Sequence, residues 1–281
     1  MSRLDFYKNL CYNINEKIYG GVYRMKYGMM YDNQSRHLND FDEITLKYEH
    51  KTAEIIEHIK KYKQEQRIIL NIQALEDVLD CKDIFLAAAE VHSNIAIMGA
   101  KSDLEELKEI GLPFFFAEVV DSWDKLNGYI QQGVSDVYVG NEFAFDLSTI
   151  SQVCKLYNVR IRVFANVAQS NYPSVGNTMT QFFIRPEDVT MYDDIVDVIE
   201  FFGPLDRQDV LYEIYTKGKW IGNLNELIIG LKEDINNTLI AGCFGTLRRT
   251  CKKRCAHTTK CDICTRFISI QNTLKEVNSE R

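Results

Sequence analysis

The stretch PFFFAEVVDSWDKLNGYIQQGVSDVYVGNEFAFDLSTISQVCKLYNVRIRVFAN, residues 113–166, alternates short apolar runs with longer amphipathic segments. The runs are rich in Val, Ile, Phe and Tyr, which is typical of buried strands. Between them, apolar residues return at helical spacing. Gly133 stands where the first helix should end, and Ser122 and Ser148 stand where the two helices should be capped. The stretch therefore predicts three strands joined by two helices.

The same alternation continues on both sides of this stretch. The segments with strand character are 67–73, 94–100, 113–119, 136–142, 160–166, 181–187, 210–216 and 238–244. The segments with helical patterns are 75–92, 102–111, 122–133, 147–158, 189–203 and 223–235. Strand–helix alternation with nearly continuous apolar strands is typical of a parallel sheet. About eight such strands favour an α/β fold of the closed (β/α)8 TIM-like barrel type over an open doubly wound sheet.

Residues 1–66 follow this alternation less well and predict an N-terminal helical extension. The segment 19–32 resembles a short hairpin or an extended arm. The segment 41–66 has the apolar spacing of an amphipathic helix that caps the barrel or supplies its first helix. We therefore expect an N-terminal arm and capping helix at 1–66. One barrel should occupy 67–281, including a C-terminal Cys-rich metal-binding loop at 243–264 and a C-terminal helix.

Composition limits the class of protein. The chain has 281 residues, of which 46% are hydrophobic and 11% aromatic, so it can bury a large core and is not a disordered chain. The N-terminus carries charge from residue 3, and no run approaches the roughly 18 apolar residues of a membrane span. The net charge of -7 argues against nucleic-acid binding over the whole surface. We expect a cytoplasmic protein without a membrane partner.

Five of the eight cysteines lie within 243–264. Because thiolates repel one another and oxidise, such crowding in a reducing compartment predicts a metal ion or an iron–sulfur cluster. The expected metal ligands are Cys251, Cys255, Cys261 and Cys264, with Cys243 as a fifth thiol or as the replacement for one of these. The spacing leaves two cofactors open: Zn²⁺ held by four sulfurs, and a [4Fe-4S] cluster.

The cysteine segment also concentrates positive charge. Between residues 244 and 260 it has six basic residues and no acidic one: Arg248, Arg249, Lys252, Lys253, Arg254 and Lys260. These cations can neutralise the negative charge of a thiolate-bound centre and can bind a phosphate group. We therefore expect Arg248, Lys252 and Arg254 to bind the cofactor. We also expect 248–260 to contact RNA or DNA; the alternative is a solvated loop. A protein partner or a homo-oligomer stays open.

Polar residues also stand where the predicted strands end. In a (β/α)8 barrel the chemistry lies at these carboxyl ends, so the side chains there can converge on one cavity. The candidates are Glu118, Glu142, Arg185 and Glu187 as catalytic residues and Asn166 as a cofactor-binding residue. Arg185 suits a carboxylate or a phosphate, and the alternative is an ion pair with Glu187 or Glu142.

Two segments carry a family resemblance. GVSDVYVGNEFAFDLSTIS (133–151) and the later strand VRIRVFAN (159–166) resemble the peptidase U32 family. Its members share a G-(A/V)-x-x-V-Y-(V/L)-G strand, a helix, and a V-x-(V/I)-x-V-x-x-N/H strand. The resemblance implies a barrel whose four cysteines hold an iron–sulfur cluster, and hydroxylation of RNA bases or quinone precursors rather than proteolysis. Family cysteines follow the strand that corresponds to 160–166. Here the chain continues VAQSNYPSVGN without a cysteine, so no cysteine role carries over by position.

Three hypotheses about function remain. The first is a U32-like enzyme that modifies a nucleobase or a similar planar substrate over a metal centre. The second is a zinc-stabilised barrel that acts on nucleic acid with carboxylates such as Glu118 or Glu142. The third is a non-catalytic barrel that binds nucleic acid or a protein through the basic Cys-rich loop. The chain has no Gly-rich phosphate loop, no H-E-x-x-H and no G-x-S-x-G, which disfavours NTP hydrolysis and proteolysis.

Overall fold

The computed structural model describes residues 25–30, 37, 39–48, 54–73, 75, 78–140, 143–168, 183–203, 205–231, 234–240, 244 and 263–279. Within these residues one sheet contains nine strands. They are β1 (Lys26–Met30), β2 (Glu43–Lys47), β3 (Arg67–Asn71), β4 (Ile95–Gly99), β5 (Phe114–Phe116), β6 (Val119–Val120), β7 (Asp136–Val139), β8 (Arg160–Phe164) and β9 (Val198–Glu200). Every pairing between them is parallel.

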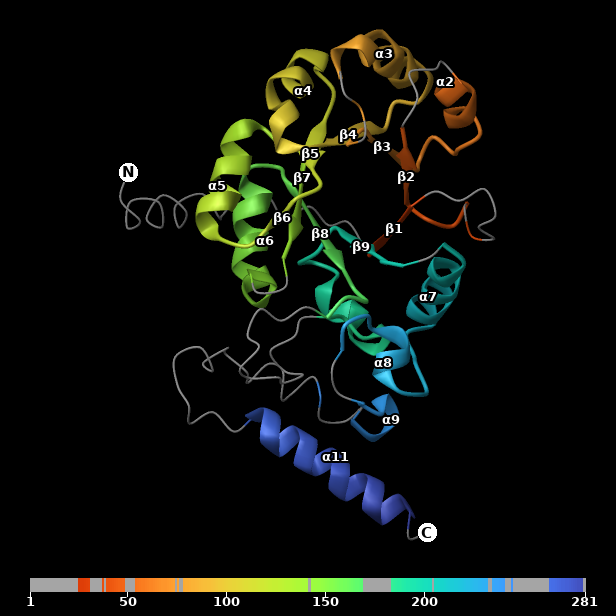
Figure 1. Cartoon of the computed structure of the whole chain (residues 1–281), viewed down its shortest axis with the longest axis vertical. Helices are drawn as coiled ribbons and strands as arrows, with labels where there is room; N and C mark the ends of the chain where they lie inside the picture. The colour runs from red at the N-terminus through yellow and green to blue at the C-terminus, as the bar shows by residue number, and fades with distance from the viewer. Residues whose placement is uncertain are drawn as a thin grey trace.

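The sheet curls into a barrel. The strand order is β5-β4-β3-β2-β1-β9-β8-β7-β6, so its two ends are β5 and β6. Only Ala117 and Glu118 separate these two strands along the chain, which brings the two ends of the sheet together. Near this junction the backbone N–H of Ser135, just before β7, donates to the carbonyl of Phe114 over 2.7 Å. Figure 1 shows the strands surrounding a common centre with the helices outside them.

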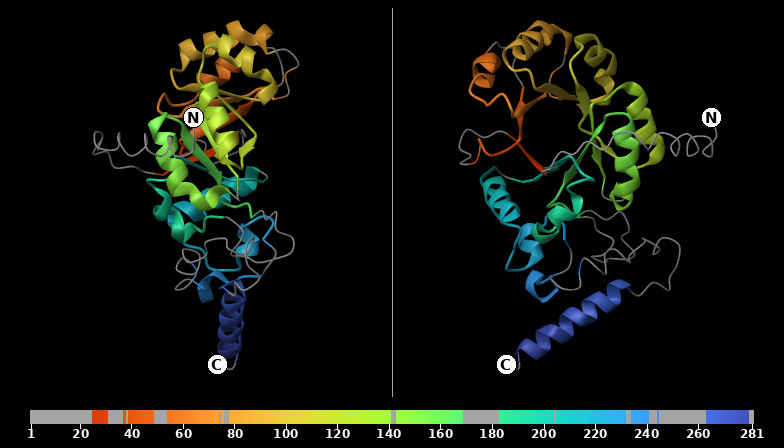
Figure 2. Two further views of the ribbon diagram at one scale, coloured as in Figure 1. Left: turned by 90° about the vertical axis from the view of Figure 1, so that its left-hand side faces the viewer. Right: turned by 180° about the vertical axis from the view of Figure 1, so that it is seen from behind.

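The helices cover the outer face of the barrel. They are α2 (Glu54–Ile59), α3 (Lys82–Val91), α4 (Leu104–Ile110), α5 (Trp123–Gln132), α6 (Leu147–Leu156), α7 (Leu205–Lys217), α8 (Leu224–Leu227) and α9 (Asn237–Ile240). The last helix, α11 (Ile263–Ser279), lies beyond α9 and away from the strands (Figures 1 and 2). Gln271 of α11 holds it to the barrel by donating to the carbonyl of Asp234 and accepting from the N–H of Asn236. No helix of the described residues is long and apolar enough to cross a membrane.

The central part of the sequence prediction is confirmed. Strands form within 67–73, 94–100, 113–119, 136–142 and 160–166, and helices form within 75–92, 102–111, 122–133 and 147–158. Gly111 and Gly133 end their helices with φ of 78° and 82°, values that favour glycine. Ser122 caps α5 by accepting from the N–H of Lys125. Asp146, rather than Ser148, precedes the first residue of α6.

The prediction for 19–66 missed two strands, while the helix expected within 41–66 forms over a shorter range, as α2. The segment 19–32 contains β1, which pairs with β2 and β9, and the segment 41–66 contains β2 followed by the short helix α2. The barrel strands therefore begin at Lys26 and not at residue 67. Glu43 obscured the strand character of β2, because a charged residue in a strand normally indicates an outward position. In the structure the Glu43 side chain points inward and pairs with arginines.

The prediction is also wrong in the last third of the chain. The segment 189–203, expected as a helix, contains the end of a 3₁₀ helix (Pro186–Tyr192) and then β9. The segment 210–216, expected as a strand, lies inside α7, and 238–240 belong to α9. Residues 183–185 form no strand, and among the described residues of 223–235 (223–231 and 234–235) only those of α8 are helical. Pro186 explains one of these differences, because its ring favours the first turn of a helix.

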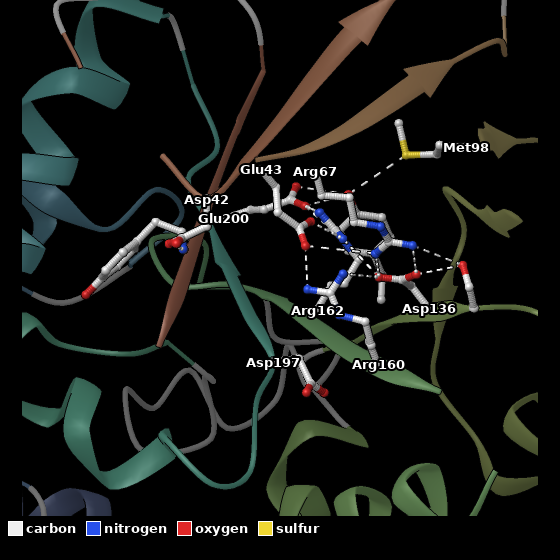
Figure 3. A network of polar contacts seen from close by, with 12 residues as sticks. Asp42, Glu43, Arg67, Met98, Asp136, Arg160, Arg162, Asp197 and Glu200 are labelled. Carbon is white, nitrogen blue, oxygen red and sulfur yellow. Dashed lines mark hydrogen bonds and ion pairs between the residues drawn. The ribbon is translucent and has the colours of Figure 1, made fainter. Parts of the chain in front are cut away.

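Charged side chains fill the amino-terminal half of the barrel interior (Figure 3). Glu43, Arg67, Asp136 and Arg160 are the first residues of β2, β3, β7 and β8, so they form one layer. Arg162 lies one layer higher and is completely buried. Arg67 binds both oxygens of Asp136, at 2.7 and 2.8 Å.

Arg162 joins this layer to the residues above it. Its Nη1 donates to Glu43 over 2.6 Å and to Asp136 over 3.0 Å, and its Nε donates to Glu200 over 2.9 Å. Three arginines and three carboxylates therefore balance one another inside the barrel. Burial alone would raise the pKa of Glu43 and of Asp136, but the arginine charges outweigh it and hold both pKa values below their usual range.

Replacing Asp136 with Asn keeps the shape of the side chain and removes the charge shared by Arg67 and Arg162. We expect Asp136→Asn to lower the free energy of unfolding by about 3–5 kcal/mol, because it leaves buried cations without compensation. Urea unfolding measures this as a lower midpoint. Lys82→Ala, which breaks the exposed pair with Glu109, should cost less than about 1 kcal/mol. Equal midpoints for the two variants would contradict the structural role of the network.

Candidate functional site

A cavity of about 540 Å³ opens at the carboxyl ends of the strands. Its volume lies in the range of sites for small molecules, and its position is where barrel enzymes place their chemistry. The described residues that line it are Thr45, Asn71, Gln73, Met98, Ala117, Tyr138, Phe164, Glu200, Phe201, Phe202, Gly203 and Gln208.

One wall of the cavity is polar. Glu200 is the last residue of β9, Thr45 lies in β2 and Asn71 is the last residue of β3. These strands are neighbours in the order β9-β1-β2-β3, so the three side chains occupy one arc of the barrel. Gln73 follows β3 on the same side. The arc presents carboxylate, hydroxyl and amide groups to the cavity.

The opposite wall is apolar and largely aromatic. Met98 lies in β4, Ala117 follows β5, Tyr138 lies in β7 and Phe164 ends β8. The rings of Tyr138 and Phe164 are nearly parallel, with their centroids 5.3 Å apart and an angle of 4° between their planes. The exposed ring of Phe202 stands at the rim, edge-on to Phe164. This wall offers flat surfaces against which a planar ligand can pack.

Glu200 connects the cavity to the charged interior. Its Oε1 accepts from Nε and Nη2 of Arg162. The hydroxyl of Tyr138 lies 3.0 Å from Oε1 and 2.9 Å from Oε2, and it has one proton to donate. Since a carboxylate oxygen can accept two hydrogen bonds, Oε2 keeps the capacity to accept one from a ligand.

Gly28 of β1 makes room for Glu200. The two residues are partners in the register of β1 and β9. A Cβ atom at position 28 would lie 3.1 Å from Cγ of Glu200 and 3.3 Å from Cγ1 of Val198, closer than ordinary contacts. A glycine at this position therefore lets the Glu200 side chain cross β1 and reach the cavity.

Two further polar groups of the cavity have unused hydrogen-bonding capacity. Asn71 Oδ1 accepts from the N–H of Gln73 over 3.2 Å, and no described residue accepts from its amide N–H₂ group. The Thr45 side chain is almost completely buried, yet its hydroxyl has no hydrogen bond to a described residue. No Lys or Arg is among the described residues of the lining. The lining therefore suits a neutral ligand that both donates and accepts hydrogen bonds.

Asn166 and Glu118 lie close to the cavity without lining it. Asn166 is buried and binds the backbone of Phe202 in both directions, accepting from its N–H and donating to its carbonyl, each over 2.8 Å. It thus holds the rim at Phe202. Glu118 is exposed, accepts from the hydroxyl of Tyr129 over 3.0 Å and lies 3.6 Å from Lys125.

Arg185 and Glu187 belong to a second, separate cluster. Arg185 binds both oxygens of Asp188, at 2.7 and 2.8 Å, and its guanidinium lies 4.5 Å from the ring centre of Phe244. The ion pair of Arg185 is thus with Asp188 and not with Glu187, one of the two partners considered as an alternative; the other, Glu142, lies outside the described residues. Glu187 Oε1 accepts from the side chain of Asn237 over 2.7 Å, while its buried Oε2 has no partner among the described residues. Neither residue is among those that line the cavity.

The remaining predicted residues lie outside the described part of the chain. They are Glu142, Cys243, Arg248, Cys251, Lys252, Arg254, Cys255 and Cys261. The backbone of Cys264 belongs to the first turn of α11, but its side chain is outside the description. Among the residues that the structure describes, no group of three or more His, Cys, Asp or Glu side chains could hold a metal ion.

Sequence reasoning missed the residues at the centre of the site. Glu200 fell in a segment predicted as a helix, and Tyr138 and Arg162 fell in correctly predicted strands whose inward positions were not considered. One signal was available. Arg162 interrupts the apolar run of 160–166, and a charge in the middle of a buried strand needs a partner inside the fold.

Neither a protein-family model nor a curated protein sequence matches the chain. Among solved structures, the chain is similar to a U32 peptidase, with a TM-score of 0.41 and 10% identity over 67% of this chain and 96% of that chain. It is also similar to a tryptophan synthase complex from Pyrococcus furiosus (TM-score 0.43, 14% identity, 74% and 97% covered). A third similar structure is a 4-hydroxy-2-oxoglutarate aldolase (TM-score 0.38, 10% identity, 68% and 92% covered). The resemblance to the U32 family is distant, and none of these likenesses carries an argument about function.

The hydroxyl of Tyr138 should stay protonated in alkaline solution. Burial, and after it the charge of Glu200, raises the pKa of Tyr138 well above its usual value of 10.0. The measured quantity is the number of tyrosines that ionise between roughly pH 9 and 11. In the native protein, Tyr138→Phe should leave this number unchanged, because Tyr138 does not ionise in this range. In urea, Tyr138→Phe should lower the number by one, because the unfolded Tyr138 does ionise there. Phenolate absorbance measures both numbers.

The measurement in urea provides the control for this titration, because unfolding removes the buried environment and the charge of Glu200 that raise the pKa of Tyr138. Because the folded pKa of Tyr138 is raised, its contribution to stability is complete below about pH 10 and is lost as the pH rises through the folded pKa. A native Tyr138 that ionises together with the exposed tyrosines would contradict this assignment.

Proposed function

We propose that the barrel binds a small planar molecule, such as a nucleobase or a nucleoside, in the cavity at its carboxyl end and modifies it. The observation that carries this proposal is the division of the cavity into a polar arc and an aromatic wall. A flat heterocycle has apolar faces and a hydrogen-bonding edge, and these two kinds of surface fit the two walls. The position at the carboxyl ends of parallel strands supports chemistry on the bound molecule.

The volume and the charge of the cavity agree with this class of ligand. About 540 Å³ accommodates a nucleobase with its sugar. Tyr138 and Phe164 offer stacking, and stacking of a base on an aromatic side chain contributes about 1–3 kcal/mol. Since the described lining has no cation, a phosphate would lie outside the cavity, towards its mouth.

The cysteine segment is the proposed source of a metal or iron–sulfur centre. Cys251, Cys255, Cys261 and Cys264, with Cys243 as an alternative, would supply thiolates, which suit both Zn²⁺ and a [4Fe-4S] cluster. Two described elements bound this segment: Phe244, which packs against Phe183 and Arg185, and α11, which Gln271 holds to the barrel. A bound [4Fe-4S] cluster supplies electron-transfer chemistry, and bound zinc supplies structural stability.

A second candidate function uses the basic residues of the same segment. Because 244–260 has six cations and no acid, it could bind RNA or DNA as a zinc-stabilised surface without catalysis by the barrel. The nature of the metal separates the two candidates. Iron with a broad absorption near 400 nm favours the first function, and a colourless protein with zinc favours the second.

The cavity can be tested by blocking it. Ala117→Phe places a ring in the opening while leaving the charged network intact. We expect some nucleosides of a panel of the common ribonucleosides to bind the protein saturably in calorimetry, and Ala117→Phe to weaken that binding at least about 10-fold. Leu86→Phe, which introduces the same ring at an exposed position of α3, is the control. Binding that survives in Ala117→Phe, or that no nucleoside shows, would argue against this use of the cavity.

The metal can be tested at Cys261. We expect Cys261→Ser to release the metal from protein purified without oxygen, because a site that loses one of four thiolates binds its ion far more weakly. Elemental analysis and the absorption spectrum measure the loss. Cys154→Ser is the control: Cys154 is buried in α6, and burial raises the pKa of its thiol to about 12. Unchanged metal content in Cys261→Ser would contradict the proposed ligand set.

A further inference from the structure

We propose that Glu200 makes the cavity selective for planar ligands that carry an exocyclic amino group, and that it discriminates against the corresponding keto compounds. This inference rests on the proposed function, because it names the substrate class of the same cavity. It follows from which hydrogen-bonding groups of the polar arc are already used and which are open to a ligand.

The first step concerns the direction of the hydrogen bond at Glu200. Both donors that contact its carboxylate, Arg162 and Tyr138, come from the protein, and their contacts leave Oε2 able to accept one more hydrogen bond. A carboxylate oxygen cannot donate. The ligand group that meets Oε2 must therefore be an N–H or an O–H.

The second step concerns the rigidity of this acceptor. Arg162 holds Oε1 through two of its nitrogens, and Arg162 itself is completely buried and bound to Glu43 and Asp136. The hydroxyl of Tyr138 approaches from the apolar wall, and Gly28 leaves the space in which the side chain lies. Glu200 therefore cannot turn away from a poorly matched ligand without breaking contacts with buried groups.

The third step concerns Asn71, which lies at the other end of the polar arc, in the order β9-β1-β2-β3. Asn71 has an amide N–H₂ group that no described residue uses, so it can donate to an acceptor on the ligand. A heterocycle with an amino group beside a ring nitrogen presents a donor and an acceptor next to each other. Such a ligand can donate to Glu200 and accept from Asn71. In the keto analogue the two groups are exchanged: an oxygen replaces the amine and the ring nitrogen carries a hydrogen. In the same orientation, lone pairs then face the carboxylate of Glu200 and an N–H faces the N–H₂ group of Asn71.

Cytidine and uridine are the probes for this inference, because they differ at this edge. We expect wild-type protein to bind cytidine at least about 10-fold more tightly than uridine in calorimetry, since uridine in the same orientation places an oxygen against the carboxylate and loses a hydrogen bond to a charged group. Glu200→Gln should reduce the ratio to less than about 2-fold, because an amide can turn either its oxygen or its N–H₂ group to the ligand.

Two further variants test the role of Glu200 even if the Glu200→Gln variant does not fold. Gly28→Ala retains the Glu200 carboxylate but pushes its Cγ, so it should also reduce the ratio. Thr45→Val removes a polar group of the same arc and should lower both affinities without changing the ratio. An unchanged ratio in Gly28→Ala together with Glu200→Gln would overturn the role of Glu200.

The outcomes separate this inference from the function on which it rests. Equal affinity for cytidine and uridine in the wild-type protein, with both blocked by Ala117→Phe, would refute the selectivity and leave the binding site in place. Absence of binding by either nucleoside and by every other member of the panel would refute both. Tighter binding of uridine than of cytidine would show that the cavity prefers the keto compound, and it would refute the proposed selectivity.

Discussion

The structure depends on the charge of Arg162, which is buried in the centre of the barrel and has to be compensated there. Its carboxylate partners Glu43, Asp136 and Glu200 come from β2, β7 and β9. Because side chains alternate between the two faces of a strand, a shift of one residue in any of these strands would remove a partner from the interior. An uncompensated buried guanidinium is so costly that the ion network selects one register.

This network also determines where the barrel is filled and where it is open. The first layer, with Glu43, Arg67 and Asp136, is packed with ion pairs. One layer further, Arg162 reaches only part of the Glu200 carboxylate, and the cavity begins on the other side of that residue. Glu200 is thus both the last member of the structural network and the first polar group of the candidate site.

The same inward charges explain how much of the fold the sequence could predict. Strands such as 95–99 and 114–116 contain only apolar residues and glycine, so their pattern predicted them directly. In contrast, β2 begins with Glu43 and β9 ends with Glu200, which made both segments resemble amphipathic helices. The partners of these charges lie 119 and 38 residues away in the chain. No local pattern shows such a pairing, so the site that it builds was found only in three dimensions.

Packing joins the cavity to the beginning of the cysteine segment. Phe201 lines the cavity and lies 4.9 Å, between ring centres, from Tyr215, whose hydroxyl donates to the carbonyl of Ile184. The next residue, Arg185, covers the ring of Phe244, after which the basic segment begins. Close-packed side chains transmit small displacements, because no voids absorb them. A centre bound at the proposed cysteines could therefore influence the cavity through this aromatic layer, without a ligand bridging the two.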